Sequence, residues 1–375
     1  METKIGVITY HSAYNFGSVL QAYATQESIE KIGYSVEIVN YRMKSQIKYY
    51  SMIHLNNGLK AFLKDLLHLP QIGKYITRKN RFEQFIEELN LTKEFNEPEE
   101  VDEADGMFDI FVSGSDQIWN KHSNELEESE WKYMYPYLLC FTNKKKVSYA
   151  SSIVNMKDEE LTYIVDKVKK FDKISFREKA SCDRFKSLFG IESNEVLDPT
   201  LLLNSEEWSS KIGTIPEKMI NKKYILYYAL EGVKKTRKIM PKLQKMAKRK
   251  GCVLVVITPL SCFTYSKGVI NAIDAGPKEF LGWIKGAELV ITNSYHGTLF
   301  SVNLGTNFYT LQEKESTDNR IKGILLKLEL EKRIISDVDS ILYEKEKINF
   351  QDVWKKLDIY RKESIEFLKK ALKYE

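Results

Sequence analysis

Short apolar runs alternate with helix-length segments along most of the chain, and this alternation constrains the fold more than any other feature. The first half has apolar runs at 4–10, 35–40, 108–113, 146–150, 173–176 and 195–197, with helical patterns at 17–31 and 158–170. A second series has runs at 223–229, 253–258, 288–292 and 307–311, with a helical pattern at 234–250. This order is typical of parallel sheets covered by helices. We therefore predict an α/β fold.

The length of the chain indicates more than one domain, because 375 residues exceed what a single core usually supports. We assign residues 1–204 to an N-terminal lobe and 205–345 to a C-terminal lobe. The last segment, 346–375, is predicted to be a helix that could cross back to the first lobe. Residues 41–96 are the least strand-like part of the first half, and we interpret them as a helical insertion.

Positive charge is concentrated in that insertion. The whole chain has 57 basic and 52 acidic residues, whereas 41–82 has nine Lys or Arg and only Asp65 as an acid. Apolar residues also recur there at helical spacing, at Met52, Leu55, Leu59, Phe62, Leu63, Leu66 and Leu69. Such a helix either packs on its own domain or lies on an anionic membrane surface. Charge this local argues against nucleic acid as a partner.

Several functional classes lack their sequence signals. The four cysteines are far apart and form no C-x-x-C pair, which argues against a zinc site or a disulfide scaffold. Walker A, H-E-x-x-H and G-x-S-x-G motifs are missing, and no G-x-G-x-x-G follows a strand. The first residues have no signal-peptide profile and no apolar run reaches membrane-span length. We expect a cytoplasmic protein, either soluble or peripheral on the inner face of the membrane.

The turn after the run 288–292 is the strongest candidate for a ligand site. It places His296 where a strand ends and a helix begins, a position that favours anions. His296 could instead cap the helix or pack on the sheet, but Asn293 and Ser294 can supply the cap. Gly297 would let a ligand approach the backbone. Because Arg177 also follows a short strand, two cationic strand ends predict one anionic ligand.

Six motifs in order resemble the polysaccharide pyruvyl transferases. They start at Tyr14 (YNFGSVLQAYA), Val112 (VSGSDQIWN), Ser175 (SFRE), Val196 (VLDPT), Asn293 (NSYHGT) and Asp318 (DNRI). The resemblance covers about residues 4–335. It implies two Rossmann-like lobes facing a cleft, similar to two-lobed GT-B-type glycosyltransferases, with the acceptor on the first lobe and the donor on the second.

The resemblance also implies a reaction. The pyruvyl unit of phosphoenolpyruvate would move to two hydroxyls of a hexose, in a surface polysaccharide or its lipid-linked precursor, with formation of a cyclic ketal and release of phosphate. Phosphoenolpyruvate is a co-substrate, and no step requires a metal or another cofactor. A nucleotide-sugar-dependent glycosyltransferase of the same architecture, or a non-catalytic glycan-binding partner, are the alternatives.

The donor-site residues implied by the family are Arg177 and His296, together with the turn residues Asn293, Ser294 and Gly297. Lys314 and Arg320 lie where the family often has basic residues. A phosphate and a carboxylate require at least two cationic anchors, and arginine can hold either group bidentately. Histidine is suited to proton transfer near neutral pH, so we expect His296 to be the acid.

The acceptor side should lie on the first lobe. Asp116, in the turn after 108–113, is our candidate for the base or hydroxyl-orienting group, although it could instead cap a helix. Asn15 and Gly17 are in the first strand-to-helix turn, where backbone N–H groups can bind substrate oxygens. Trp119 either contacts the acceptor or belongs to the core. Asp198, which precedes Pro199, is interpreted as a structural turn.

Overall fold

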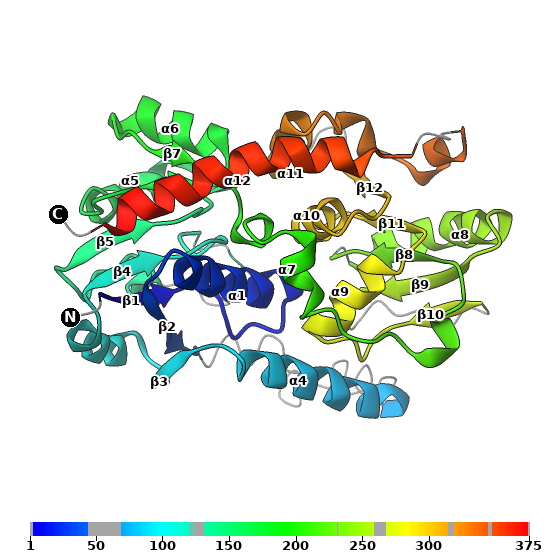
Figure 1. Ribbon diagram of the computed structural model, residues 1–375, viewed down its shortest axis with the longest axis horizontal. Coiled ribbons are helices and arrows are strands. Elements are labelled where there is room, and N and C mark those ends of the chain that lie inside the picture. The colour runs from blue at the N-terminus through cyan, green and yellow to red at the C-terminus, as the bar shows by residue number, and fades with distance from the viewer. Residues whose placement is uncertain are drawn as a thin grey trace.

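Two parallel sheets form the centre of the molecule. The computed structural model describes residues 3–43, 69–120, 123, 131–230, 232–258, 268–313, 319–343 and 347–373. One sheet has the strand order β3-β2-β1-β4-β5 and the other β10-β9-β8-β11-β12-β13. Figure 1 shows the two sheets next to each other, each with helices packed against it. The predicted α/β fold with parallel sheets is confirmed.

The first lobe comprises β1 (Lys4–Ile8), α1 (Phe16–Lys31), β2 (Ser35–Tyr41), α4 (Ile72–Ile86), β3 (Leu91–Phe95), β4 (Ile110–Ser113), β5 (Lys145–Ser148), α5 (Asp158–Val168), β6 (Ser175–Phe176), α6 (Lys179–Phe189) and β7 (Asn194–Glu195). Every residue of β4 is buried, as expected for a strand covered on both faces. Strands β6 and β7 pair with each other, and single bridges from Ser151 to Asp116 and Phe176 link them to the sheet. The ends of β4, β6 and β7 therefore follow one another along one edge.

The second lobe comprises α7 (Ser205–Ser209), β8 (Tyr224–Tyr228), α8 (Val233–Arg249), β9 (Val253–Ile257), β10 (Val269–Asn271), α9 (Pro277–Lys285), β11 (Leu289–Thr292), α10 (Tyr295–Asn303), β12 (Phe308–Leu311), α11 (Arg320–Lys327) and β13 (Ile334–Ile335), and the chain ends with α12 (Phe350–Leu372). The strand order reverses between β1 and β4 in the first sheet and between β8 and β11 in the second. Ligands of open α/β sheets bind at such reversal points, beyond the carboxyl ends of the strands.

The last helix joins the lobes. In Figure 1, α12 runs along one side of the molecule from the second sheet to the first. Arg361 of α12 donates to the carbonyl of Leu201 and to Oδ1 of Asn303 in α10. Further along the helix, Ser364 accepts a hydrogen bond from the backbone N–H of Leu197. The division of the chain at 204 and 345 stays a prediction.

Two further contacts hold the lobes together. The guanidinium of Arg81, on α4, donates to the backbone and side chain of Asp274, close to the start of α9. The rings of Phe16 in α1 and Phe280 in α9 stack with their centroids 4.4 Å apart. The start of α1 is therefore fixed against the second lobe.

The expected insertion at 41–96 needs a correction. Residues 44–68, which include its predicted amphipathic helix, lie outside the described residues. The described remainder forms α4 and then β3, which pairs in parallel with β2 as the edge strand of the first sheet. The insertion therefore ends before Leu91. The sequence hid β3 because an edge strand tolerates exposed charges, here Lys93 and Glu94.

No helix in the described parts of the chain is both long and apolar enough to span a membrane.

Candidate functional site

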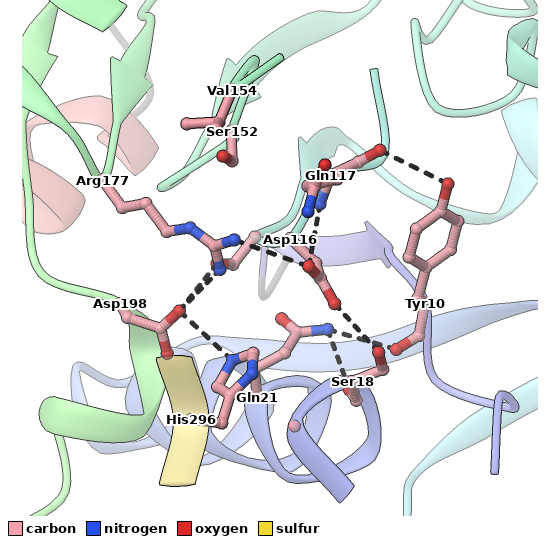
Figure 2. A network of polar contacts seen from close by, with 12 residues as sticks. Tyr10, Ser18, Gln21, Asp116, Gln117, Ser152, Val154, Arg177, Asp198 and His296 are labelled. Carbon is pink, nitrogen blue, oxygen red and sulfur yellow. Dashed lines mark hydrogen bonds and ion pairs between the residues drawn. The ribbon is translucent and has the colours of Figure 1, made fainter. Parts of the chain in front are cut away.

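Five turns from the two lobes meet at one place. Each follows the carboxyl end of a strand, and the turns carry Gly17 after β1, Asp116 after β4, Arg177 after β6, Asp198 after β7 and His296 after β11. Figure 2 shows the side chains of Asp116, Arg177, Asp198 and His296 directed toward one another. Four of the five turns belong to the first lobe, so the second lobe completes the site with His296.

Arg177 lies at the centre, with a side chain that is 0% exposed. Its Nη1 donates to Oδ2 of Asp198 at 2.9 Å, its Nε donates to Oε1 of Glu178 at 3.1 Å, and its Nη2 lies 3.5 Å from Oδ1 of Asp116. Within the described residues, Nη2 has no hydrogen-bond partner. Nη2 is therefore the nitrogen of Arg177 best placed to donate to a ligand, and the expected bidentate contact stays a prediction.

Asp198 is a site residue that the sequence analysis assigned only to a turn. Its Oδ1 does hold the turn, accepting from the backbone and hydroxyl of Thr200. Its Oδ2 accepts from Arg177 and lies 3.5 Å from Nε2 of His296. Burial favours a higher pKa for Asp198, but the charges of His296 and Arg177 outweigh it and hold the pKa well below its ordinary value. The carboxylate is therefore ionised at neutral pH and joins the two lobes.

His296 contacts the first lobe through a glycine. It lies in the first turn of α10, which Ser294 caps by accepting from the N–H of Gly297 at 3.3 Å. Its imidazole rests on the backbone of Gly17: a Cβ at that position would lie 2.6 Å from Cε1 and closer still to Nδ1 and Cγ. Gly17 therefore makes room for His296. Nε2 of His296 has no hydrogen-bond partner in the part of the chain that the structure describes.

Asp116 does not cap a helix, so that alternative is wrong. Its backbone has φ of +82°, a left-handed conformation that is uncommon for residues other than glycine. Its Oδ1 accepts from the N–H of Gln117, and its Oδ2 accepts from the hydroxyl of Ser18 at 2.9 Å. The strained turn directs the carboxylate toward Arg177 and α1.

Two expected acceptor contacts are not available. Oδ1 of Asn15 caps α1 by accepting from the N–H groups of Gly17 and Ser18, so these donors are already used. Trp119 is 0% exposed, and its Nε1 donates to the carbonyl of Tyr137 at 3.0 Å. Trp119 is a core residue, and its assignment to the acceptor site is wrong. A large aromatic side chain that follows a buried strand is usually buried as well, because burial removes its apolar surface from water.

The turn between β11 and α10, which we assigned to the donor, also makes contacts that hold the fold. Oδ1 of Asn293 accepts from the N–H of Leu230 at 2.9 Å. A Cβ at Gly297 would lie 2.5 Å from Oγ1 of Thr292 and 2.7 Å from Cδ1 of Tyr228. Close packing therefore explains why this residue is glycine, and its assignment to the donor site stays a prediction.

Arg320 is the second arginine near the site. It begins α11, and its guanidinium lies 5.6 Å from the centre of the Tyr295 ring, which also faces Arg177 at 4.6 Å. Both arginines thus contact one aromatic ring beside His296. Lys314, the other basic residue that we assigned to the donor, lies outside the described residues. The described residues contain no group of three or more His, Cys, Asp or Glu side chains that could hold a metal ion.

Solved structures with the same architecture define the class of fold. The chain is similar to UDP-N-acetylglucosamine 2-epimerase from Rickettsia bellii, with 11% identity over 98% of this chain and 96% of that one and a TM-score of 0.58. It is also similar to UDP-GlcNAc 2-epimerase from Methanocaldococcus jannaschii (13% identity, 96% and 93% covered, TM-score 0.53). An α-glucosyltransferase in complex with UDP and DNA gives 11% identity, 98% and 95% covered, and a TM-score of 0.50. At such low identity these likenesses show the fold alone, which is two Rossmann-like lobes of the GT-B type.

The family follows from the sequence profile. The profile of the polysaccharide pyruvyl transferases matches residues 15–314, which include the turns of Gly17, Asp116, Arg177, Asp198 and His296. The chain therefore belongs to the polysaccharide pyruvyl transferase family. No curated protein matched the sequence.

Proposed function

We propose that the protein transfers the pyruvyl unit of phosphoenolpyruvate to two hydroxyls of one hexose, in a surface polysaccharide or its lipid-linked precursor. The product is a cyclic pyruvate ketal, and phosphate is released. The family supports the pyruvyl transfer. The donor and the ketal are our proposal.

One observation carries this proposal. Nη2 of Arg177 and Nε2 of His296 are buried nitrogens from opposite lobes, and among the described residues neither has a hydrogen-bond partner. Nη1 of Arg177 and Nε2 of His296 both lie within 3.5 Å of Oδ2 of Asp198, so the guanidinium and the imidazole are held next to each other. Buried polar groups without partners are rare and often mark a ligand site. An anionic oxygen of the donor would satisfy both.

The proposed reaction needs one group that gives a proton to the donor and one that takes a proton from the acceptor. A proton bonds to C3 of phosphoenolpyruvate, a hydroxyl oxygen bonds to C2, the bond from C2 to the phosphate oxygen breaks, and the second hydroxyl oxygen bonds to C2. The two hydroxyls lose two protons: one replaces the proton that was transferred to C3, and the other leaves with phosphate. His296 gives the proton to C3, and the ionised Asp198 holds the imidazole in place.

Asp116 serves the acceptor side in this proposal. Its carboxylate is held by Ser18 and Gln117 and lies beside the guanidinium of Arg177. We assign it to take the proton of the attacking hydroxyl. Asp116→Asn should lower kcat by about 10²-fold or more with little change in the affinity for phosphoenolpyruvate, because removing one general base costs about that much. The reverse pattern would place Asp116 in the donor site.

Calorimetry tests the donor. Wild-type protein should bind phosphoenolpyruvate in preference to a panel of UDP-sugars, and His296→Ala should bind it much more weakly. Lys322→Ala, which removes an exposed cation from α11, is the control and should bind as wild type does. Binding of one UDP-sugar without phosphoenolpyruvate would make the protein a glycosyltransferase and refute the proposal.

A lipid-linked acceptor would bring the enzyme to the cytoplasmic face of a membrane. The basic apolar segment at 41–82 supports this extension at the level of the sequence. Flotation with anionic liposomes should decrease when Lys48, Lys60, Lys64 and Lys74 are all changed to Glu. Equal flotation of the two proteins would refute the membrane contact.

A further inference from the structure

Gln21, in α1, faces the same site. It lies one helical turn after Gly17 and Ser18, so all three share one face of α1. Gly17 contacts His296, and Ser18 contacts Asp116. Gln21 is 0% exposed. Figure 2 shows its amide oxygen directed toward the space bordered by Arg177, Asp198 and His296.

The neighbours of Gln21 fix which end of the amide is nitrogen. Nε2 donates to Oγ1 of Thr9 at 2.8 Å, and it also approaches the carbonyls of Tyr10 at 3.2 Å and Ser18 at 3.0 Å. Carbonyl oxygens only accept, and the hydroxyl of Thr9 already donates to the carbonyl of Ser115. An oxygen in this position would face three acceptors. Oε1 must therefore be the atom that faces the site.

Oε1 of Gln21 has no hydrogen-bond partner among the described residues. A buried acceptor without a partner is unfavourable, so a ligand that donates a hydrogen bond to it is favoured. Phosphoenolpyruvate, ionised at neutral pH, offers acceptors for Arg177 and His296 and hardly any hydrogen for Gln21. A sugar hydroxyl offers such a hydrogen.

We propose that Oε1 of Gln21 binds one hydroxyl of the acceptor hexose and orients it toward the donor. The assignment rests on the proposed function, because it takes the acceptor to be a sugar. It places the acceptor hydroxyl on α1 rather than on Trp119 or the N–H groups at the start of that helix.

Hexoside binding without donor tests the proposal. The probes are the p-nitrophenyl pyranosides of glucose, galactose, mannose and N-acetylglucosamine, followed by monodeoxy analogues of the one that binds best. Gln21→Met should weaken binding about tenfold, equivalent to about 1.4 kcal/mol. One deoxy analogue should lose a similar factor on wild type and little more on Gln21→Met, because the two changes remove the same hydrogen bond.

Two variants separate this role from a structural one. Thr25→Val removes a buried hydroxyl one turn further along α1, which donates to the backbone carbonyl of Gln21, and should bind hexosides as wild type does. Gln21→Leu removes the same acceptor oxygen and should weaken hexoside binding by a similar factor; it provides the test if Gln21→Met does not fold. Unchanged binding by Gln21→Met, equal deoxy losses in both proteins, or no hexoside binding by wild type would overturn the proposal.

The affinity for phosphoenolpyruvate, measured separately, keeps the two proposals apart. Gln21→Met should bind it within about twofold of wild type, and a parallel loss would place Gln21 in the donor site and overturn its assignment to the acceptor. Failure of wild type to bind phosphoenolpyruvate would refute the proposed donor, while the hexoside result would still decide the role of Gln21.

Discussion

Gly17→Ala is the sharpest test of how the two lobes share the site. The added Cβ would lie 2.6 Å from Cε1 of His296, whereas ordinary van der Waals contact begins at 3.4 Å. The imidazole must therefore move by at least about 0.8 Å, and more at Nδ1 and Cγ. A misplacement of about 1 Å can cost about 10²-fold in rate, so we expect kcat/KM to fall by that factor.

The expected loss does not come from α1 itself. Alanine forms helix better than glycine, and Gly17 is not among the glycines with positive φ, so the backbone accepts the substitution. The clash should cost about 1–3 kcal/mol of folding free energy, which leaves the protein folded. Ketal formation measured by phosphate release, beside a thermal melt, separates the two effects.

Gly73→Ala is the matched control for this experiment. Gly73 is an exposed residue of α4, and a Cβ there would meet nothing within 4 Å. Its rate should equal that of wild type, and its stability should be equal or slightly higher. If Gly17→Ala turned over as fast as Gly73→Ala, the contact between His296 and α1 would have no part in the reaction.

Four further predictions concern the buried charges and the core. Arg177→Ala should lower the free energy of unfolding by about 3–5 kcal/mol, because Asp198 and Glu178 would stay buried without their cation; wild-type stability in urea would contradict this. Because the pKa of Asp198 is lowered, its carboxylate stabilises the fold at pH values above its ordinary pKa of about 3.9, and this stabilisation is lost as the pH falls below that value. Asp198→Asn should therefore lose less stability below pH 4 than wild type does. Burial raises the pKa of Glu178, so this residue makes the folded state less stable as the pH rises above its ordinary pKa of about 4.3. Glu178→Gln should therefore lose less stability than wild type over that rise in pH. Trp119→Phe should cost about 1–3 kcal/mol of stability and leave the acceptor KM unchanged; a raised KM would return Trp119 to the acceptor site.

The sequence predicts the site where a local pattern marks a strand end. His296, Arg177 and Asp116 each follow an apolar run, and parallel strands bring their carboxyl ends to one edge. The sheets themselves follow from the same runs. Short edge strands such as β3 and β10 were missed, because an edge strand need not be apolar throughout.

Contacts between distant turns are not visible in local pattern. One carboxylate oxygen of Asp198 accepts hydrogen bonds within its own turn, and the other contacts Arg177 and His296. Only the contact within the turn could be predicted from the sequence. Gln21 occupies a buried helix face, where a polar side chain usually pairs within its own lobe. Gly17 was expected to bind substrate through the N–H groups of its turn, whereas in the structure the imidazole of His296 packs against its backbone. Each of these depends on how the lobes meet.

The charges around Arg177 indicate where donor affinity must come from. The guanidinium contacts Asp116, Glu178 and Asp198, and Asp198 at least is firmly ionised. A cation so well compensated attracts a multiply charged anion weakly. In the proposed reaction Arg177 therefore mainly holds the carboxylates in place, and further positive charge for the donor has to come from its surroundings.

Arg320 is the described residue best placed to supply that charge. It is half-buried at the start of α11, and its guanidinium faces the same tyrosine ring as Arg177. Losing a hydrogen bond to a charged group costs about 1.5–3 kcal/mol, so Arg320→Gln should weaken phosphoenolpyruvate binding by about 10- to 150-fold in calorimetry. Lys322→Gln removes the same charge from the exposed side of the helix and should have little effect. Equal effects of the two variants would mean that donor affinity depends on overall charge, and Arg320 would have no place in the donor site.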